Sequence, residues 1–358
     1  MTLMRNRFPE RRRVTINDVA VRAGVSKTTV SKFLSANEYY IAAETRRRIE
    51  AAVRELDFRP NAVAQGLSNR RSKAIGVIVA SVANPFYPEL IAGVEEIAHP
   101  AGYTILLGSS DGRPSLEADV VRSMMQRQVD GLVMASVTMR DQEVRRVADS
   151  GVAVVLASRN LSRDVVDTVV VDNRGGAAAA TEHLLAHGHR RVAHIAGPQN
   201  IVPFRLRARG HRDAVDARGV PFDEGLLRVC RDSRQVDGEA AARELLARDE
   251  PPTAVFVASD SMALGVLQEC ERQNLRVPDD LAVVGFDNIW ISRLPGISLT
   301  SVDGKARRVG RVAADLLGQR LAETGPATDG PPAAEHVMLS GDLIRRGSCG
   351  CPPGERDD

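Results

Sequence analysis

Five residues between positions 27 and 32 have the chemistry of a surface that binds nucleic acid. They are two lysines and three short hydroxyl residues: Lys27, Thr28, Thr29, Ser31 and Lys32. Lysine ammonium groups pair with phosphates, and small hydroxyl groups hydrogen-bond to phosphates and base edges. An ordinary polar surface contains the same residue types, but their clustering at the start of one short segment favours a nucleic-acid partner.

The elements that must position these residues have the pattern of a helix-turn-helix. Thr15 and Asp18 form a capping-box-like start for a first helix, and Gly24 breaks that helix. Ser26 is a good N-cap for a second helix over 27–34. The apolar residues at helical spacing form the expected inner faces: Ile16, Val19, Ala20, Ala23, Val30, Phe33 and Leu34. A second helix held in this way can enter the major groove of DNA.

Charge is concentrated at the same end of the chain. Residues 1–74 carry 16 Lys and Arg against 7 Asp and Glu, and the remaining residues carry 32 against 39. This excess of positive charge in the first fifth of the chain indicates that this part binds an anionic partner. We expect residues 1–13 to be a basic, disordered arm. A third helix is expected over 44–58, and Arg46, Arg47 and Arg48 near its start are further candidates for phosphate contacts, as is Tyr40 in the preceding loop.

From residue 73 onward, apolar runs typical of buried parallel strands alternate with segments typical of crossover helices. Two such series predict two α/β subdomains. The strands are expected at 74–80, 104–107, 131–135, 153–157, 168–171, 192–196, 254–257 and 281–286. Because ligands in such sheets bind at the carboxyl ends of strands, we expect a ligand in the cleft between the subdomains.

Several classes of protein are disfavoured by the sequence. No apolar run is long enough for a membrane helix, and the first residues lack a signal-peptide pattern, so we expect a cytoplasmic protein without a membrane partner. No Gly-x-Gly-x-x-Gly follows a strand and no Ser/His/Asp constellation stands out. We therefore expect neither a cofactor nor an enzymatic activity.

A metal site is not expected either. His183 and His187 have the spacing of a zinc pair, but they lack the glutamate of a metalloprotease motif. Cys349 and Cys351 form a Cys-Gly-Cys in a tail rich in proline, glycine and charge, and only His336 is close to them in sequence. We expect the tail, residues 346–358, to be disordered.

Five segments carry a family resemblance: Val14-Thr-Ile-Asn-Asp-Val-Ala, Ala23-Gly-Val-Ser26, Thr29-Val-Ser31, Glu44-Thr-Arg and Phe58-Arg-Pro-Asn-Ala. They resemble the head of the LacI/GalR (lactose-repressor) family, and the similarity runs from about residue 14 to 345. It implies an all-α helix-turn-helix head at 14–59, a hinge helix and linker at 60–72, and an α/β core at 73–345. The core of this family resembles periplasmic sugar-binding proteins and serves effector binding and dimerisation.

The resemblance also implies how DNA is bound. A homodimer would bind a pseudo-palindromic operator. Most members of the family repress transcription, so repression is the implied outcome. In the hinge helix, Leu67 would enter the minor groove at the central step, preceded by Asn61, Ala64 and Gln65. Two departures bear on the operator sequence: Lys32 stands where the family usually has arginine, and Ala42 stands where a serine usually caps the third helix.

Seven residues near strand ends match effector-contacting positions of the family. Phe86 and Tyr87 would stack on a flat ligand face, Arg207 would donate to ligand oxygens, and Asp287 would accept from ligand hydroxyls. Arg159 and Trp290 are further candidates, and Ser259 stands where the family more often has asparagine. Asp260 beside Ser259 is equally well explained as a structural residue. An aromatic wall with an arginine and an aspartate predicts a sugar or a sugar derivative as effector.

The resemblance further implies that the chain crosses between the subdomains three times. We expect an N-subdomain of about 73–171 and 303–333 and a C-subdomain of about 172–302 and 334–345. Two alternatives stay open. One is an α/β binding protein or enzyme with an incidental basic head, and the other is a regulator controlled by a partner protein.

Overall fold

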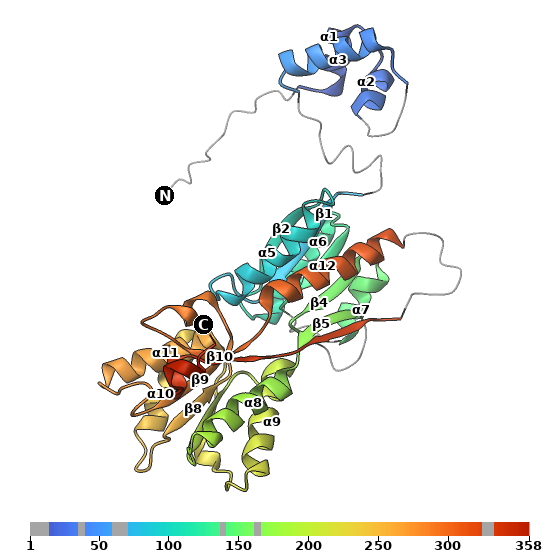
Figure 1. Cartoon of the computed structure of the whole chain (residues 1–358). Coiled ribbons are helices and arrows are strands. Elements are labelled where there is room, and N and C mark those ends of the chain that lie inside the picture. The colour runs from blue at the N-terminus through green and yellow to red at the C-terminus, as the bar shows by residue number, and fades with distance from the viewer. Residues whose placement is uncertain are drawn as a thin grey trace, which may run out of the picture. The chain divides into compact units, whose positions relative to one another are not determined.

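Two units make up the chain, Met1–Ser72 and Lys73–Asp358. The structure is a computed structural model that describes residues 14–34, 40–58, 71–136, 141–160, 166–323 and 333–357. Figure 1 shows the first unit as a group of short helices and the second as a larger α/β unit. Among the described residues, no helix is long and apolar enough to cross a membrane.

The N-terminal unit contains α1 (Ile16–Ala23), α2 (Lys27–Leu34) and α3 (Ala43–Glu55). Thr15 forms the predicted capping box: its hydroxyl accepts from the Asp18 amide at 3.4 Å, and the Asp18 carboxylate accepts from the Thr15 amide at 2.8 Å. Gly24 ends α1 with a φ of 61°, a left-handed conformation that glycine adopts at little cost. No side chain caps α3, because Ala42 stands at its N-cap.

A small apolar core holds these helices together. Val19 of α1, Val30 of α2 and Ile49 of α3 are fully buried, and Phe58 packs against the same cluster. Each helix therefore contributes one face to the core and leaves the other face exposed. The second helix is thus held by packing on both α1 and α3, as a helix-turn-helix requires.

The larger unit contains two six-stranded sheets. The first has the order β11-β5-β4-β3-β1-β2, and all its pairs are parallel. Its strands are β1 (Ala74–Val79), β2 (Thr104–Ser109), β3 (Gly131–Met134), β4 (Ala153–Ala157), β5 (Asp167–Val171) and β11 (His336–Leu339).

The second sheet has the order β12-β10-β9-β8-β6-β7 and is parallel except for β12, which is antiparallel to β10. Its strands are β6 (Val192–Ala196), β7 (Leu227–Val229), β8 (Ala254–Val257), β9 (Ala282–Asp287), β10 (Thr300–Asp303) and β12 (Leu343–Ile344). All residues of β6, β8 and β9 are buried, as expected of parallel strands covered on both faces.

Helices cover both sheets, and the family's two-subdomain α/β fold is confirmed (Figure 1). The first-sheet half carries α5 (Phe86–Ala98), α6 (Pro114–Gln126), α7 (Asp141–Asp149) and α12 (Ala306–Ala322). The second-sheet half carries α8 (Asn173–Ala186), α9 (Val202–Ala217), α10 (Gln235–Leu246) and α11 (Asp260–Arg272).

Glycines allow α5 and α12 to pack in close contact. A Cβ on Gly310 of α12 would lie 2.0 Å from the carbonyl oxygen of Leu90 in α5. Conversely, a Cβ on Gly93 of α5 would lie 2.0 Å from the carbonyl oxygen of Arg307 in α12. These separations are far below any permitted contact, so only glycine fits at either position.

The chain passes between the two halves three times, after β5, after β10 and after β11, which confirms the expected number of crossings. One expected boundary was wrong. Residues 334–345 were assigned to the C-subdomain, but His336–Leu339 pairs with β5 in the first sheet. Val337 and Leu339 of this strand pack against the apolar core of the first sheet, so burial holds the strand there. The third crossing therefore occurs at residues 340–342.

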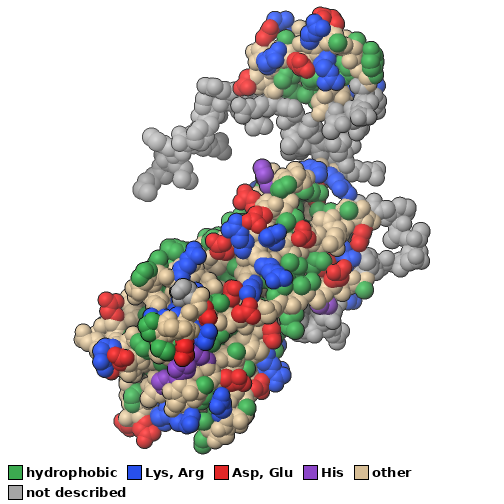
Figure 2. Space-filling view, in the orientation of Figure 1, with side chains coloured by type: hydrophobic (Ala, Val, Ile, Leu, Met, Phe, Trp, Pro, Cys, Tyr) green, Lys and Arg blue, Asp and Glu red, His purple; other side chains and the backbone are tan. Residues whose placement is uncertain are grey.

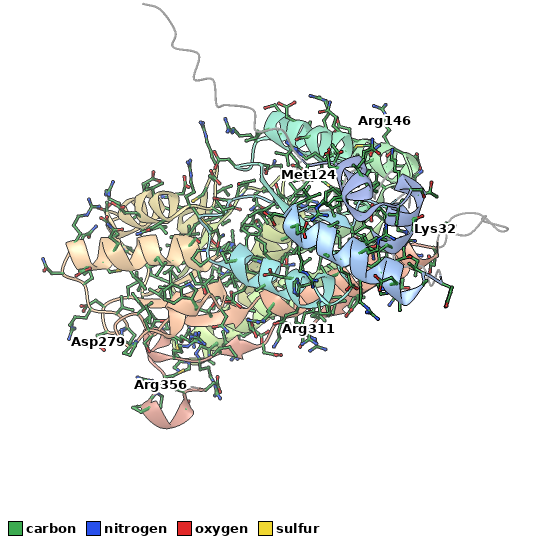
Figure 3. All side chains as sticks on the ribbon, turned by 90° about the horizontal axis from the view of Figure 1, so that it is seen from above. Lys32, Met124, Arg146, Asp279, Arg311 and Arg356 are labelled. Carbon is green, nitrogen blue, oxygen red and sulfur yellow. The ribbon has the colours of Figure 1, made fainter. Side chains whose placement is uncertain are left out.

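The expectation of a disordered tail was also wrong, because residues 346–357 have a defined structure. A short 3₁₀ helix, η3 (Gly347–Cys349), packs on β9 and β10, and Cys349 is fully buried. The Ser348 hydroxyl donates to the Val283 carbonyl at 2.6 Å. Arg356, near the chain's end, lies on the outer side of this half (Figure 3). Outside the tail itself, the partners of residues 346–351 lie 46 to 168 residues earlier in the sequence, so local composition could not reveal them.

Candidate functional site

The outer face of α2 presents a short row of cations and hydroxyls. Val30 on the opposite face is fully buried, which fixes the direction in which this row points. Four of the predicted DNA-contacting side chains are exposed in this row: Lys27, Thr28, Ser31 and Lys32.

The other two residues of this segment hold the start of α2. The Ser26 hydroxyl accepts from the Thr29 amide at 3.0 Å, and the two hydroxyls are hydrogen-bonded to each other at 2.8 Å. The predicted cap is therefore present, and Thr29 is only partly exposed. Both side chains already have partners within the head, which gives them a positioning role there.

One predicted phosphate candidate has a different role. Arg48 extends its guanidinium to the turn between α1 and α2 and donates to the carbonyl oxygens of Ala23 and Gly24, at 2.5 and 2.8 Å. It therefore fastens α3 to the turn instead of standing free for phosphate. Arg46 lies over the Phe33 ring at 5.5 Å, and Arg47 is largely exposed.

The remaining DNA-binding predictions fall at the edges of the described head. Tyr40 is 97% exposed, and the exposed Thr15 forms the cap of α1. The predicted hinge residues lie outside the residues that the structure describes: Asn61, Ala64, Gln65 and Leu67.

In the larger unit, the predicted aromatic residues stand at the start of α5. Phe86 and Tyr87 pack edge to face with ring centroids 5.5 Å apart, and both are largely buried. Arg159, after β4, donates to the Tyr87 hydroxyl at 3.2 Å and to the Ala135 carbonyl at 3.3 Å. Because β1 and β4 are parallel strands of one sheet, their following segments meet at one edge of it.

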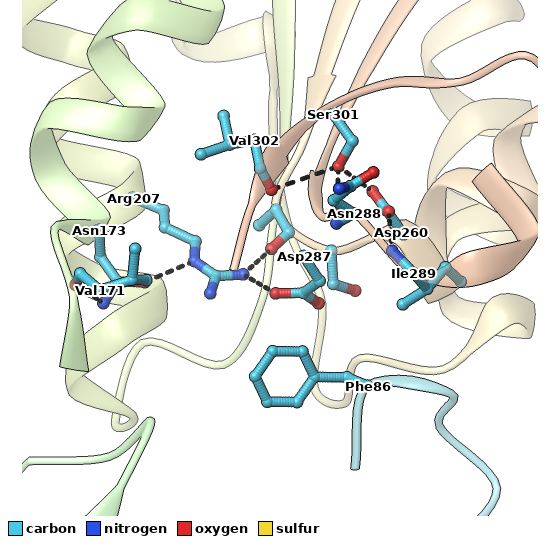
Figure 4. Close-up of polar contacts among 12 residues, drawn as sticks. Phe86, Val171, Asn173, Arg207, Asp260, Asp287, Asn288, Ile289, Ser301 and Val302 are labelled. Atoms are coloured by element: carbon cyan, nitrogen blue, oxygen red, sulfur yellow. Dashed lines mark hydrogen bonds and ion pairs between the residues drawn. The ribbon is translucent and has the colours of Figure 1, made fainter. Parts of the chain in front are cut away.

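Arg207 and Asp287 form a buried ion pair in the second-sheet half (Figure 4). Arg207 of α9 donates to Asp287 at 3.2 Å, to the Ala258 carbonyl at 2.5 Å and to Asn173 at 2.9 Å. Its guanidinium also lies 3.5 Å from the centroid of the Phe286 ring. The charge of Arg207 is thus balanced, and its orientation is fixed by three partners.

Asp287 ends β9 with an unusual backbone. Its φ is 112°, a region that favours glycine, and such conformations persist only where surrounding contacts enforce them. Burial raises the pKa of Asp287 to about 6, and Arg207 opposes that rise. Figure 4 shows the Phe86 ring, from the first-sheet half, beside this carboxylate. A ligand here would meet an aromatic face and a carboxylate together.

Asp260, at the start of α11, holds the loop that follows β9. It is fully buried and accepts three hydrogen bonds, from the Ile289 amide at 3.0 Å and from the Ser292 and Ser301 hydroxyls at 2.7 Å. Burial and the nearby Asp287 raise the pKa of Asp260 to about 7. Ser259 is buried as the N-cap of α11. These contacts give both residues structural roles.

A pocket of about 440 Å³ lies between the start of α5 and the loop after β9, within the size range of small-molecule sites. Phe86, Asp287 and Trp290 line it, and Trp290 in η2 (Trp290–Arg293) is about half exposed. Tyr87, Arg159 and Arg207 are not among its lining residues. The structure therefore brings three of the predicted effector residues to one pocket and places Arg207 directly behind Asp287.

Sequence reasoning missed several polar residues of this region. Asn173 is buried, and its side chain joins Arg207 to the Val171 carbonyl. On either side of Arg159, Ser158 Oγ and Asn160 Oδ1 are buried without a hydrogen-bond partner among the described residues. Only their places directly after β4 could have pointed to them, because buried polar atoms without partners are expected at ligand sites.

Comparisons with known proteins agree with these observations. Residues 15–61 match the family described as bacterial regulatory proteins, lacI family. Residues 72–333 match the family of periplasmic binding proteins and the sugar binding domain of the LacI family.

Among curated relatives, catabolite control protein A of Priestia megaterium is 35% identical over 85% of this chain and 91% of its own length. The ribose operon repressor of Escherichia coli K12 is 32% identical over 93% of this chain and 99% of its own length. Both are named as regulators rather than enzymes.

Solved structures give the same result. The lac repressor dimer bound to operator and the anti-inducer ONPF has a TM-score of 0.80 at 28% identity, with 94% of this chain and 99% of that chain covered. A CelR–cellobiose complex has a TM-score of 0.69 at 32% identity, with 94% and 100% covered. With a helix-turn-helix head, a two-sheet α/β core and relatives matched over nearly their whole length, this chain is a member of the LacI family of bacterial regulatory proteins.

Proposed function

We propose that this protein is a homodimeric transcriptional repressor that binds a pseudo-palindromic operator with an affinity set by a small sugar-like effector. The observation that carries the proposal is the row of exposed cations and hydroxyls on α2, whose direction is fixed by the buried Val30. One such head reads a half-site, so a symmetric operator requires a two-fold dimer. Binding to chromosomal DNA would require a cytoplasmic location, which we include in the proposal.

The effector half of the proposal rests on the pocket between α5 and the loop after β9. Phe86 offers an aromatic face, Asp287 offers a carboxylate, and Arg207 behind it fixes that carboxylate in place. This combination suits a ligand with several hydroxyl groups. Two similar structures were solved with small ligands, CelR with cellobiose and the lac repressor with ONPG. Arg159, Tyr87, Ser259 and Trp290 complete the set that we propose for effector binding or its support.

An effector can switch DNA binding only if it binds more tightly to one of two arrangements of the core. The pocket is lined by residues of both halves, Phe86 from α5 and Asp287 from β9. Closing or opening the two halves around a ligand would therefore change the contacts of that ligand. Because the linker to the head precedes β1, such a movement would alter how the two heads of a dimer are spaced.

The test is fluorescence anisotropy of the purified full chain on palindromic DNA from the region upstream of its own gene. Saturable, salt-sensitive binding that a scrambled half-site abolishes is expected, and one sugar or sugar phosphate from a panel should change the affinity. Absence of binding to every palindrome would refute the DNA half of the proposal. Stabilisation by purines with no response to any sugar would refute the effector class.

A variant separates the two halves of the proposal. Asp287→Asn should abolish the response to the sugar while operator binding without sugar stays within a few-fold of the original. Asp279→Asn is the matched control, because Asp279 is a surface carboxylate of the same half and its side chain is 63% exposed (Figure 3). An unchanged sugar response in Asp287→Asn would show that the effector binds elsewhere.

A further inference from the structure

The folded tail brings two cysteines to two histidines of α8. Cys351 Sγ lies 3.3 Å from His183 Nε2 and 3.8 Å from Nε2 of His187, just past the end of the helix. Cys349 Sγ lies 2.9 Å from Cys351 Sγ. His183, Cys349 and Cys351 all present ligand atoms within 4.8 Å of one another. Ligand atoms of His183, Cys349 and Cys351 thus meet at one place on the second-sheet half, although the two segments are about 165 residues apart in sequence. The exposed His187 adds a fourth ligand atom at the edge of this cluster, 3.8 Å from Cys351 Sγ.

Histidine side chains also gather at the surface of this half in Figure 2, beside apolar and acidic groups. The ring centroids of His183 and His187 are 4.3 Å apart, because residues one helical turn apart share a face. The site is partly enclosed: Cys349 and Cys351 are 0% and 1% exposed, and His183 is half-buried.

The distances suit a tetrahedral metal ion. With zinc–sulfur bonds of about 2.3 Å and zinc–nitrogen bonds of about 2.0 Å, a tetrahedral site separates sulfur from nitrogen by about 3.5 Å. The two Cys351–imidazole distances, 3.3 and 3.8 Å, bracket that value. The same geometry separates two sulfurs by about 3.8 Å, so a metal ion would move Cys349 and Cys351 apart by about 1 Å.

Neighbouring hydrogen bonds orient the ligand atoms. His187 Nδ1 lies 2.8 Å from the His183 carbonyl oxygen, so it carries the proton and leaves the lone pair on Nε2, which points at Cys351. The Thr300 hydroxyl donates to Cys349 Sγ at 3.1 Å, on the side away from Cys351 and the imidazoles. Bonds of this kind to the far side of ligands are a regular feature of metal sites in proteins.

We propose that Cys349, Cys351, His183 and His187 bind one zinc ion in a Cys2His2 site. A mixed thiolate and imidazole set of four is the usual structural zinc site, and it leaves no open position for catalysis. Binding releases the two thiol protons, and the two thiolates neutralise the charge of the ion. The ion joins the tail to α8, and thereby holds η3 against β9, the strand that ends in Asp287.

The sequence shows each ligand pair but not that the two pairs meet. Zinc motifs are recognised by close spacing of ligand pairs, and here each pair is close but the two pairs are far apart. The distance of 2.9 Å between the two sulfur atoms is also short enough to suggest an alternative, a disulfide between Cys349 and Cys351. A disulfide needs about 2.05 Å and would remove both thiolates from the site. The experiment has to separate these two outcomes.

The primary measurement is the zinc content of the full chain, expressed with zinc and purified under reducing conditions without chelators. We expect one zinc per chain, with loss of that zinc in Cys349→Ser/Cys351→Ser and in His183→Asn/His187→Asn. The matched control is Cys230→Ser, because Cys230 lies in a different apolar cluster and should leave the zinc content unchanged. Loss of zinc in Cys230→Ser as well would contradict the assignment of the ligands.

A second measurement on the unaltered chain does not depend on the folding of variants. Cobalt added to the chelated, reduced protein should give a thiolate-to-cobalt band in the near ultraviolet and intense tetrahedral bands in the visible. Zinc bound to the native protein should also protect two of the four cysteines from alkylation. The proposal is overturned by reduced protein that takes up neither metal, or by an intact mass that shows the Cys349–Cys351 disulfide under those conditions.

Discussion

Replacing Asp260 with asparagine should remove about 4 kcal/mol of the fall in core stability between pH 4 and pH 8. Asp260 is fully buried, and its three hydrogen-bond donors are neutral: the Ile289 amide and the hydroxyls of Ser292 and Ser301. An asparagine has the same shape as the protonated acid. Its oxygen can accept from Ile289 and Ser292, and its amide can donate to the Ser301 hydroxyl.

The magnitude follows from the raised pKa of Asp260, which goes from 3.8 to about 7 mainly through burial. Between these values the folded chain holds a proton that the unfolded chain has released, so the free energy of unfolding falls as pH rises. At about 1.4 kcal/mol per unit, the loss amounts to about 4 kcal/mol between pH 4 and pH 8. Asp287, with its pKa raised to about 6, adds a loss of the same sign.

Urea unfolding at a series of pH values measures this difference. Trp290 is the only tryptophan of the chain and lies in the loop that Asp260 holds, so its fluorescence reports the correct part of the molecule. Asp260→Asn should match the original chain near pH 4 and exceed it by about 4 kcal/mol at pH 8. Equal slopes of unfolding free energy against pH in the two proteins would refute the reasoning.

Three further predictions concern packing, the turn and DNA. Gly310→Ala should lower the free energy of unfolding of the core by about 3 kcal/mol or more in the same urea experiment. Gly318 lies on the same helix with open space around it, so Gly318→Ala should be neutral or slightly stabilising. Arg48→Met leaves the Ala23 and Gly24 carbonyl groups without their donor, so it should lower the free energy of unfolding of the head by about 2 kcal/mol. The exposed Arg47 is the control, and Arg47→Met should change that free energy by less than about 0.5 kcal/mol. Thermal unfolding followed by the circular dichroism of the helices measures both. Lys27→Ala should reduce the slope of log affinity against log salt by about 1 per head, and an unchanged slope would show that Lys27 contacts no phosphate.

The head could be predicted from the sequence almost completely. Its signals are local: Thr15 and Asp18 are three residues apart, and Gly24 and Ser26 mark the turn within one short stretch. The exception is Arg48. Its partners, the carbonyl groups of Ala23 and Gly24, depend on how α3 packs across the turn, and nothing in the sequence around Arg48 records that packing.

The core could be predicted for the strands that are apolar throughout. The eight expected strands all exist, with ends shifted by at most two residues. The missed strands are β7, β10, β11 and β12, which are short or carry alternating or polar residues such as Thr300 and Ser301. They are held by pairing and by contacts that are distant in sequence, so composition alone does not mark them.

The candidate site was predicted as a set of residue types but not as a set of contacts. Arg207 and Asp287 were expected to face a ligand separately, and the structure pairs them with each other. Asp260 was undecided, and its three hydrogen bonds come from residues 29 to 41 positions away. Such pairings are decided by the connection of the two halves, which no local pattern encodes.

The position of β11 has a consequence for how the chain is synthesised. β11 forms the outer strand of the first sheet, yet its partner Thr168 in β5 is translated 168 residues before His336. At roughly 5–20 residues per second, the ribosome needs on the order of ten seconds or more to make that stretch. For this time the edge of β5 has no partner strand, and unpaired edges invite association with other chains. The nascent chain thus exposes an edge that favours aggregation from the emergence of β5 until β11 emerges.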